Sequence, residues 1–196
     1  MTRALRSLGL VAFALLVSKA ASAQIPVADL SSKLRLGANL VPMPFGSTKL
    51  DLGALGEAKG DTAFAFGIMP AADYSINQYF FVGFAPQITF NIKGKDSDGD
   101  AGKMLDLLLR VGGNAPVADA IQLYGYAAPG YSWVIPPEGD SSKGFVVGFH
   151  GGVIFDLSPT MFLNGEIGYQ LGYQSLHDLD YKLNYFQIGL GAGARL

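Results

Sequence analysis

The sequence predicts an all-β protein, an eight-stranded antiparallel up-and-down β-barrel that crosses a membrane. From residue 33 onward, the chain alternates large apolar with small or polar side chains in eight successive runs. Because successive strand side chains point to opposite faces, each run has one apolar face for lipid and one small, polar face for the interior. The mean hydropathy is +0.28, yet no stretch beyond the N-terminal segment approaches the roughly 20 apolar residues of a membrane helix. A membrane chain of this kind must be a closed barrel, since lipid does not tolerate open sheet edges.

The N-terminal segment 1–23 has the features of a secretory signal peptide. Arg3 and Arg6 supply the positive start, Leu8–Val17 the apolar core, and Ala21–Ala23 the small-residue cleavage site. The apolar core is too short to span a bilayer, so we expect the segment to be removed. Residues 24–196 then suit a single domain.

Composition restricts the chemistry. The chain has no cysteine, which excludes a disulfide framework, thiol catalysis and cysteine metal sites. Its formal net charge is −2 and it contains no basic run, so we expect no nucleic-acid partner.

The first four predicted strands rest on clear apolar faces. Their ranges are Lys33–Val41, Thr62–Ser75, Tyr79–Ile92 and Lys103–Gly112. In order, the outward residues are Leu34, Leu36, Ala38 and Leu40; Phe64, Phe66, Ile68, Ala72 and Tyr74; Phe80, Val82, Phe84, Ile88, Phe90 and Ile92; and Leu105, Leu107, Leu109 and Val111.

The last four predicted strands repeat the pattern. Their ranges are Ala120–Ile135, Gly144–Leu157, Thr160–Gln174 and Leu183–Leu196. The outward residues are Ile121, Leu123, Ala127, Tyr131, Trp133 and Ile135; Phe145, Val147, Phe149, Val153 and Phe155; Leu163, Ile167, Tyr169, Leu171 and Tyr173; and Phe186, Ile188, Leu190, Ala192, Ala194 and Leu196.

The predicted connections alternate in length. Residues 76–78, 113–119 and 158–159 are turns, whereas 42–61, 93–102, 136–143 and 175–181 are longer and carry most of the remaining charges. Short inner turns and long outer loops are typical of outer-membrane barrels. Prolines inside the strands remove ladder donors and mark candidate bulges: Pro70, Pro86 and Pro129. Aromatic residues near strand ends are candidates for interfacial girdles: Tyr74, Tyr79, Phe90, Trp133, Phe145, Phe162, Tyr173 and Tyr181.

The pattern resembles the small bacterial outer-membrane β-barrel proteins, the porin-like superfamily that includes OmpX, OmpW and the OmpA membrane domain. The resemblance covers essentially the whole chain after the signal peptide. The ending is similar to the terminal strand that the barrel-insertion machinery recognises in that family, although Leu196 stands where Phe or Trp is usual. The signal would comprise Tyr185, Phe186, Ile188, Leu190, Ala192, Ala194 and Leu196. The resemblance implies an eight-stranded barrel in the bacterial outer membrane, but not one function.

The predicted inner face carries four acids and three bases: Arg35, Asp73, Asp106, Arg110, Asp156, Glu166 and Arg195. Buried charges are costly unless paired, so this set predicts a salt-bridge network that plugs the lumen. A narrow gated pore whose ion pairs rearrange is the second hypothesis. The many inward glycines either leave space for water or a slim ligand, or relieve crowding in a small barrel.

We expect no catalytic residue and no cofactor. His150 points inward and has no serine at a useful spacing, which disfavours a lipid hydrolase. Asp96, Asp98 and Asp100 resemble part of a calcium loop but lack its following glycine and distal glutamate. We interpret them as a solvated hairpin tip, with weak bridging of divalent cations near lipopolysaccharide as the alternative.

The sequence thus predicts a monomeric, non-enzymatic barrel with a structural or narrow-pore role. Its expected partners are outer-membrane lipid, lipopolysaccharide and, during biogenesis, the insertion machinery. One alternative is an OmpW-like carrier of small hydrophobic molecules whose wall loosens at Pro129 and Gly130; another is an adhesin acting through loops 42–61 and 93–102. A soluble lipocalin is the rival fold, but its interior has no room for so many large apolar residues.

Overall fold

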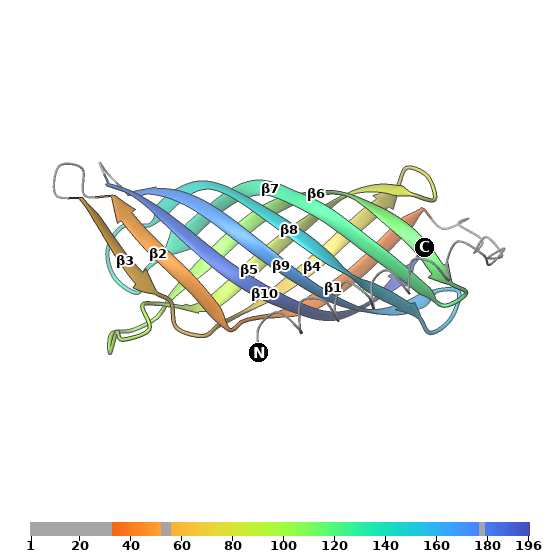
Figure 1. Cartoon of the computed structure of the whole chain (residues 1–196), viewed down its shortest axis with the longest axis horizontal. Helices are drawn as coiled ribbons and strands as arrows, with labels where there is room; N and C mark the ends of the chain where they lie inside the picture. The colour runs from red at the N-terminus through yellow and green to blue at the C-terminus, as the bar shows by residue number, and fades with distance from the viewer. Residues whose placement is uncertain (1–32, 52–55, 177–178) are drawn as a thin grey trace, which may run out of the picture.

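Eight strands close into an antiparallel barrel in the computed structural model, which describes residues 33–51, 56–176 and 179–196 (Figure 1). The wall runs β1-β4-β5-β6-β7-β8-β9-β10, and pairing of β1 with β10 closes it, so the predicted eight-stranded barrel is confirmed. Within the described residues, no helix is long and apolar enough to cross a membrane. The signal peptide proposed for 1–23 lies outside the described residues.

The strands are β1 (Leu34–Met43), β2 (Phe45–Asp51), β3 (Glu57–Asp61), β4 (Ala65–Ser75), β5 (Phe80–Ile92), β6 (Gly102–Ala118), β7 (Ile121–Ile135), β8 (Ser142–Asp156), β9 (Met161–Leu176) and β10 (Leu179–Arg195).

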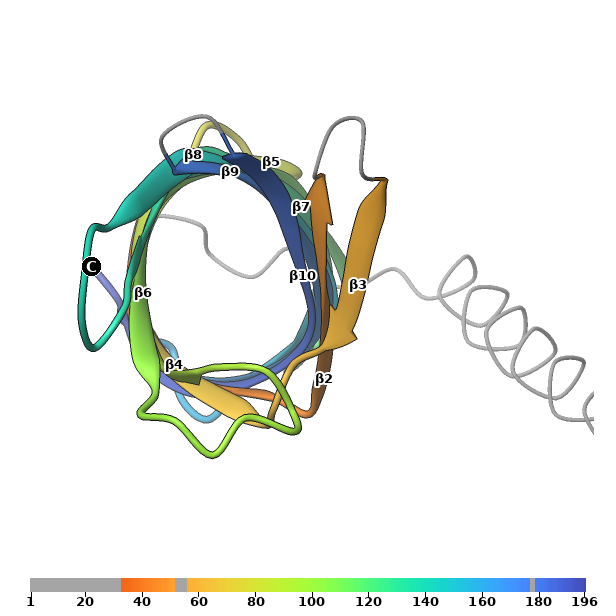
Figure 2. The ribbon, with the colours of Figure 1, turned by 90° about the vertical axis from the view of Figure 1, so that its left-hand side faces the viewer.

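Strands β2 and β3 form a hairpin where the sequence predicted a loop over 42–61. The hairpin keeps the register of β1 with β4, and β2 also pairs with β10. Between Leu40 and Phe45 the chain contains one residue more than the facing part of β10, so the alternation shifts beyond Pro44. Phe45 therefore points outward and stacks on Phe186, with ring centroids 5.4 Å apart. Figure 2 shows β3 standing away from the ring of strands.

The two ends of the barrel differ in their connections. Three short turns, 76–79, 119–120 and 157–160, lie at the end that also holds the C-terminus, which we call the terminal end. The longer connections lie at the opposite, loop end (Figure 1). Side chains close two of the turns: Asn77 Oδ1 accepts hydrogen bonds from the backbone of residues 79 and 80, and Ser158 Oγ from that of residues 160 and 161. The predicted connection 113–119 was wrong, because β6 continues to Ala118.

The prolines do not shift the register, contrary to the bulges predicted at them. At Pro70 and Pro86 the β4–β5 pairing is interrupted, between Ile68↔Ile88 and Ala72↔Phe84, but its register does not shift. On β7, Pro129 faces Val147 within a continuous β7–β8 pairing, whereas the β6–β7 pairing is interrupted beside it, between Leu108↔Gly130 and Val111↔Ala127, without a shift of register. A bulge lies instead at Asn91, whose φ of 65° is left-handed. Because of this bulge, the predicted outward Ile92 packs against the interior core.

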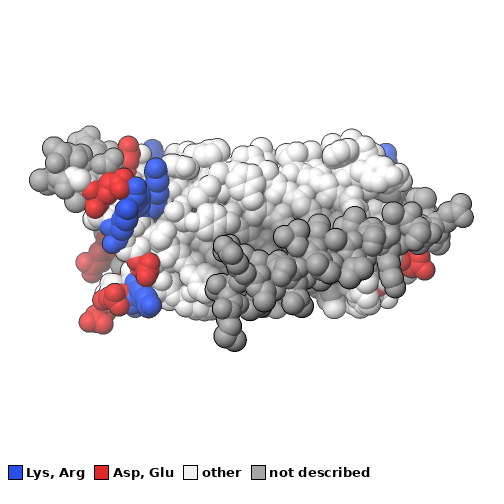
Figure 3. Space-filling view, viewed as in Figure 1, with Lys and Arg blue, Asp and Glu red and all other residues white. Residues whose placement is uncertain are grey.

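The outer wall is apolar along most of its length. Exposed large side chains cover every barrel strand, among them Leu40, Ile68, Phe84, Leu109, Phe149, Ile167 and Leu190. On the face in Figure 3, the visible charges gather at the two ends of the barrel. Two predicted girdle residues were wrong: Phe162 is 6% exposed inside the barrel, and Tyr181 packs against the core.

The interior is a packed core rather than a wholly polar channel. Toward the loop end its side chains are mainly aliphatic, with glutamine and threonine between them; toward the terminal end they are charged and aromatic. The apolar members are Val41, Met43, Ala65, Met69, Phe81, Ala85, Met104, Leu108, Tyr124, Tyr126, Ala128, Val146, Ile154, Phe162, Leu183 and Tyr185. Met104 and Leu108 of β6 are apolar residues that point inward, between apolar residues that point outward. Both faces of this strand therefore carry apolar side chains.

The apolar wall predicts a strong dependence of charge tolerance on position. Leu109 and Leu157 are 58% and 53% exposed, but Leu109 lies within β6 and Leu157 in a terminal-end turn. We expect Leu109→Arg to destabilise the barrel in lipid vesicles by about 2–4 kcal/mol, and Leu157→Arg to destabilise it by about 1 kcal/mol or less. Urea titrations in vesicles measure both. Equal losses would contradict burial of the wall in lipid.

Candidate functional site

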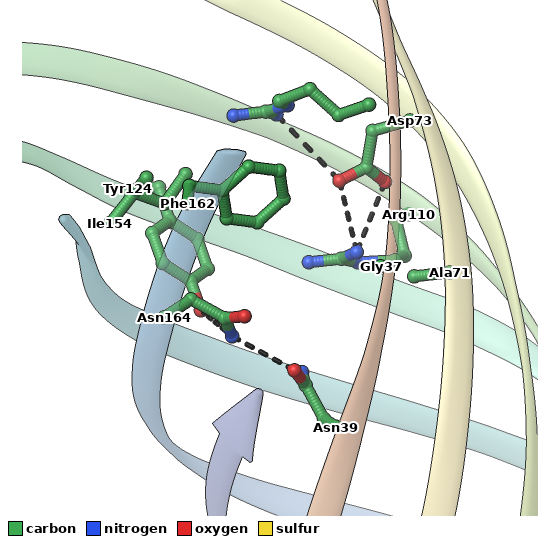
Figure 4. A pocket seen from close by; sticks show the side chains of 10 residues that line it. Gly37, Asn39, Ala71, Asp73, Arg110, Tyr124, Ile154, Phe162 and Asn164 are labelled. Carbon is green, nitrogen blue, oxygen red and sulfur yellow. Dashed lines mark hydrogen bonds and ion pairs between the residues drawn. The ribbon is translucent and has the colours of Figure 1, made fainter. Parts of the chain in front are cut away.

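The charged cluster at the terminal end of the lumen centres on Asp73. Its carboxylate lies between two guanidinium groups: Arg110 Nη1 is 3.0 Å from Oδ2 and 3.1 Å from Oδ1, and Arg35 Nη2 is 3.6 Å from Oδ2 (Figure 4). Arg35 also donates to Asn114 Oδ1 at 3.1 Å. The three charged side chains come from β1, β4 and β6 and are at most 7% exposed. Arg35 and Asp73 face each other on the neighbouring strands β1 and β4, and Arg110 reaches Asp73 over the intervening β5.

A second ion pair lies at the same end. Arg195 Nη2 is 2.6 Å from Asp156 Oδ1, and Gln122 donates to the other carboxylate oxygen at 3.2 Å. The Arg195 guanidinium also lies over the Phe162 ring, 5.4 Å from its centroid. Both clusters pair buried charges with opposite charges, which offsets part of the cost of burying them.

Glu166 is held by two tyrosines and a histidine. Tyr124 donates to its carboxylate at 2.7 Å, Tyr126 at 3.0 and 3.1 Å, and His150 Nδ1 lies 3.6 Å away. The Tyr126 ring is sandwiched, with the Arg110 guanidinium 4.0 Å from its centroid and the His150 ring stacked at 4.6 Å. Through this stack the Asp73 and Glu166 clusters form one continuous plug.

Asp106 stands apart from the plug. It is fully buried on β6, where Gln170 donates a hydrogen bond to it at 2.8 Å and the Ser132 hydroxyl also interacts with its carboxylate. The structure thus brings six of the seven predicted lumen charges into two groups with oppositely charged or hydrogen-bonding partners, and leaves the seventh without a cation beside it. Sequence parity assigns a face to each residue, but it does not show which residues meet across the barrel.

Little free space remains around the Asp73 cluster. The cavity there has a volume of about 30 Å³, and Figure 4 shows its lining. A single water needs about 10–15 Å³ of such space. The cavity therefore has room for a few water molecules.

At several inward glycines, the space that a Cβ would take is filled by side chains of neighbouring strands. A Cβ on Gly168 would lie 2.3 Å from the His150 ring, and one on Gly189 would lie 2.5 Å from Glu166 Cγ. Gly83 is covered in the same way by Asp73, and Gly193 by Phe162. Relief of crowding, one of the two hypotheses for these glycines, thus accounts for these four positions.

His150 offers no hydrolase geometry. Its side chain is 1% exposed inside the lumen, and its described contacts are Glu166 and the Tyr126 ring. Asp96, Asp98 and Asp100 are exposed in the connection between β5 and β6. Within the described ranges, no three histidine, cysteine, aspartate or glutamate side chains are grouped to hold a metal ion.

The proposed insertion signal spans both faces of β10. Tyr185 is 1% exposed and points into the lumen, whereas Leu190 and Leu196 are 61% and 64% exposed on the outside. The remaining members, Phe186, Ile188, Ala192 and Ala194, alternate with buried residues and share the outer face.

Comparisons with known proteins agree with this architecture. A family model described as outer membrane protein beta-barrel domain matches residues 10–193. Among solved structures, the chain is similar to Neisserial surface protein A, with 17% identity, a TM-score of 0.58, and coverage of 84% of this chain and 98% of that chain. It is also similar to OprG from Pseudomonas aeruginosa, with 13% identity, a TM-score of 0.58, and coverage of 84% and 96%. At such identities the likeness shows the fold alone. A comparison with curated proteins finds no match.

The packing around the glycines predicts unequal effects of two alanine substitutions on stability. A Cβ at the inward Gly152 would lie 2.3 Å from the backbone oxygen of residue 165, whereas one at the outward Gly125 would find its nearest contact at 3.5 Å. We expect Gly152→Ala to cost about 1–3 kcal/mol of folding free energy through overpacking, and Gly125→Ala to stay within about 0.5 kcal/mol. Denaturant titration in lipid vesicles compares them, and a neutral Gly152→Ala would mean a loosely filled lumen.

Proposed function

The chain belongs to the family of outer membrane protein β-barrel domains, and from this premise we propose that it is a non-enzymatic structural barrel whose lumen is closed to solutes. One observation carries the proposal: the Asp73 and Glu166 clusters join side chains from six of the eight barrel strands and leave a cavity of only about 30 Å³. In the proposed orientation the terminal end faces the periplasm and the loop end faces outward, as short inner turns and long outer loops favour.

The ion pairs support a closed state rather than an open pore. Separating Arg110 from Asp73 inside the lumen leaves two buried charges, and breaking such a pair costs about 3–5 kcal/mol. Arg110 also lies over Tyr126, so its movement would disturb the contacts of Glu166. A pore that opened readily would need these contacts to be individually weak.

Single-channel recording in a planar bilayer tests the closed lumen. We expect the refolded wild type to give no stable conductance steps, and Arg110→Ala to give small steps because it removes the side chain that links the two clusters. Lys103→Ala is the matched control, since it removes a lysine from the outer face of the same strand. Heat-shifted gel mobility verifies that each barrel has formed.

Stable steps from the wild type would overturn the closed-lumen proposal in favour of the narrow pore. A silent Arg110→Ala barrel would show that the link between the two clusters is not what closes the lumen.

A second candidate function, surface attachment, is favoured by the β2–β3 hairpin. The hairpin continues the β1–β4 register beyond the barrel wall and carries exposed charges, with Lys49 Nζ 2.6 Å from Glu57 Oε1. An ordered, charged element at the loop end suits contact with a partner outside the cell better than a collapsed loop does.

Shortening this hairpin separates attachment from barrel formation. Thr48 faces Gly60 across the hairpin, so an Asn-Gly turn replacing residues 49–59 preserves the pairing below it. We expect the variant to keep heat-shifted mobility and lose most attachment of expressing cells to protein-coated surfaces. Unchanged attachment of the expressing cells would show that the hairpin is not the attachment site.

A further inference from the structure

Asp106 is a buried carboxylate that lacks a positively charged neighbour among the described residues. The other three inward acids each have a partner: Asp73 has two arginines, Asp156 has Arg195, and Glu166 has two tyrosine hydroxyls and His150. Asp106 is 0% exposed and takes part in no ion pair of the described chain. An isolated carboxylate is among the most costly groups to bury, so something must balance its charge.

Unsatisfied oxygen atoms surround this carboxylate. Register places Gln87 of β5 and Ser132 of β7 directly beside Asp106 on the same rung, and all three are fully buried. Gln87 Oε1 has no hydrogen-bond partner. The Ser132 hydroxyl interacts with the Asp106 carboxylate, but neither Asp106 Oδ1 nor Ser132 Oγ has a partner at full hydrogen-bond geometry. Directly opposite side chains in a sheet have Cβ atoms about 4.5–5.5 Å apart, which brings the three oxygens to one small region.

Two further contacts hold the region in place. Gln87 Nε2 donates to Thr89 Oγ1 at 3.2 Å, which leaves the amide oxygen of Gln87 as the free atom. From across the lumen Gln170 Nε2 donates to Asp106 Oδ2 at 2.8 Å, and the neutral Ser132 hydroxyl is the other polar neighbour of the carboxylate. Buried polar atoms are nearly always satisfied in folded proteins. Among the described residues, the donors beside Asp106 are the neutral Gln170 amide and the neutral Ser132 hydroxyl, so no neighbouring group supplies the positive charge that would balance the carboxylate.

The surroundings offer no protein cation to fill that role. Met104 and Leu108, the inward neighbours of Asp106 along β6, are both apolar and buried. The nearest inward cation on the strand is Arg110, four residues or about 13 Å away along β6, and it is held by Asp73. The charged plug and Asp106 are therefore electrostatically separate.

We propose that Asp106, Gln87 and Ser132 form a binding site for a single hard monovalent cation of the Na⁺ or K⁺ class. Hard cations take carboxylate, amide and hydroxyl oxygens as ligands, which are the types of atom left unpaired here. One positive charge balances the one carboxylate, whereas a divalent ion would leave an uncompensated positive charge in the core. The site lies outside the plug, and the proposal holds whether the lumen conducts or not.

Refolding in different salts tests the site, because the ion is enclosed as the barrel forms. The full chain is refolded at constant ionic strength in mixtures of NaCl and choline chloride, and its unfolding by urea is measured. A ligand of the native state lowers the apparent unfolding constant in proportion to its concentration once it exceeds the dissociation constant. We expect about a tenfold decrease for each tenfold rise in Na⁺, and no decrease for Asp106→Asn.

Asp119→Asn is the matched control, since Asp119 is exposed in the turn after β6 and should keep the full Na⁺ dependence. A wild type indifferent to Na⁺ and K⁺, or an Asp106→Asn variant with undiminished dependence, would overturn the proposal and assign a bound proton to the carboxyl instead. If Asp106→Asn does not fold, anomalous scattering from wild-type crystals grown with Tl⁺ decides: a peak beside Asp106 supports the site, and its absence overturns it.

Discussion

The width of an eight-stranded barrel is the constraint on which the rest of this structure depends. Such a barrel has just enough interior for its own side chains, and this chain fills it with carboxylates, guanidinium groups and rings. Several of them fit because glycine stands opposite them on a neighbouring strand, as Gly168 does for His150 and Gly189 for Glu166. At these positions a Cβ would overlap the side chain that crosses the lumen, so the glycine and the large inward group depend on each other.

The same narrowness determines how the charges are arranged. In a wide, wet lumen the Arg110 side chain would extend into water. Here it is enclosed between Asp73 and the Tyr126 ring, and its neighbours are in turn held by other strands. Close confinement leaves little room for water, which strengthens each interaction and makes each unpaired group costly. A plug built in this way is difficult to open in part, because moving one member leaves the others unsatisfied.

Sequence parity could predict most of the wall and the inner or outer face of most residues, because lipid on one side and a narrow lumen on the other enforce strict alternation. It failed where the backbone leaves that pattern. An extra residue beside Pro44 reversed the faces of β2, and the left-handed Asn91 turned Ile92 inward. The alternation of faces also does not show at which height along the barrel axis each residue lies. The meeting of Asp73 with Arg110 depends on the stagger between strands, which alternation does not encode.

Asp106 shows why that missing information matters for function. By sequence it belongs with the other inward charges, and a count of four acids against three bases suggests only a slight excess of negative charge. The register instead places it among aliphatic residues, out of reach of Arg110 and next to neutral oxygens. An excess of one negative charge spread over a network is easily screened. The same charge isolated at one buried rung demands a positive partner at that point, so the position of the unpaired acid, rather than the overall balance, locates the proposed cation site.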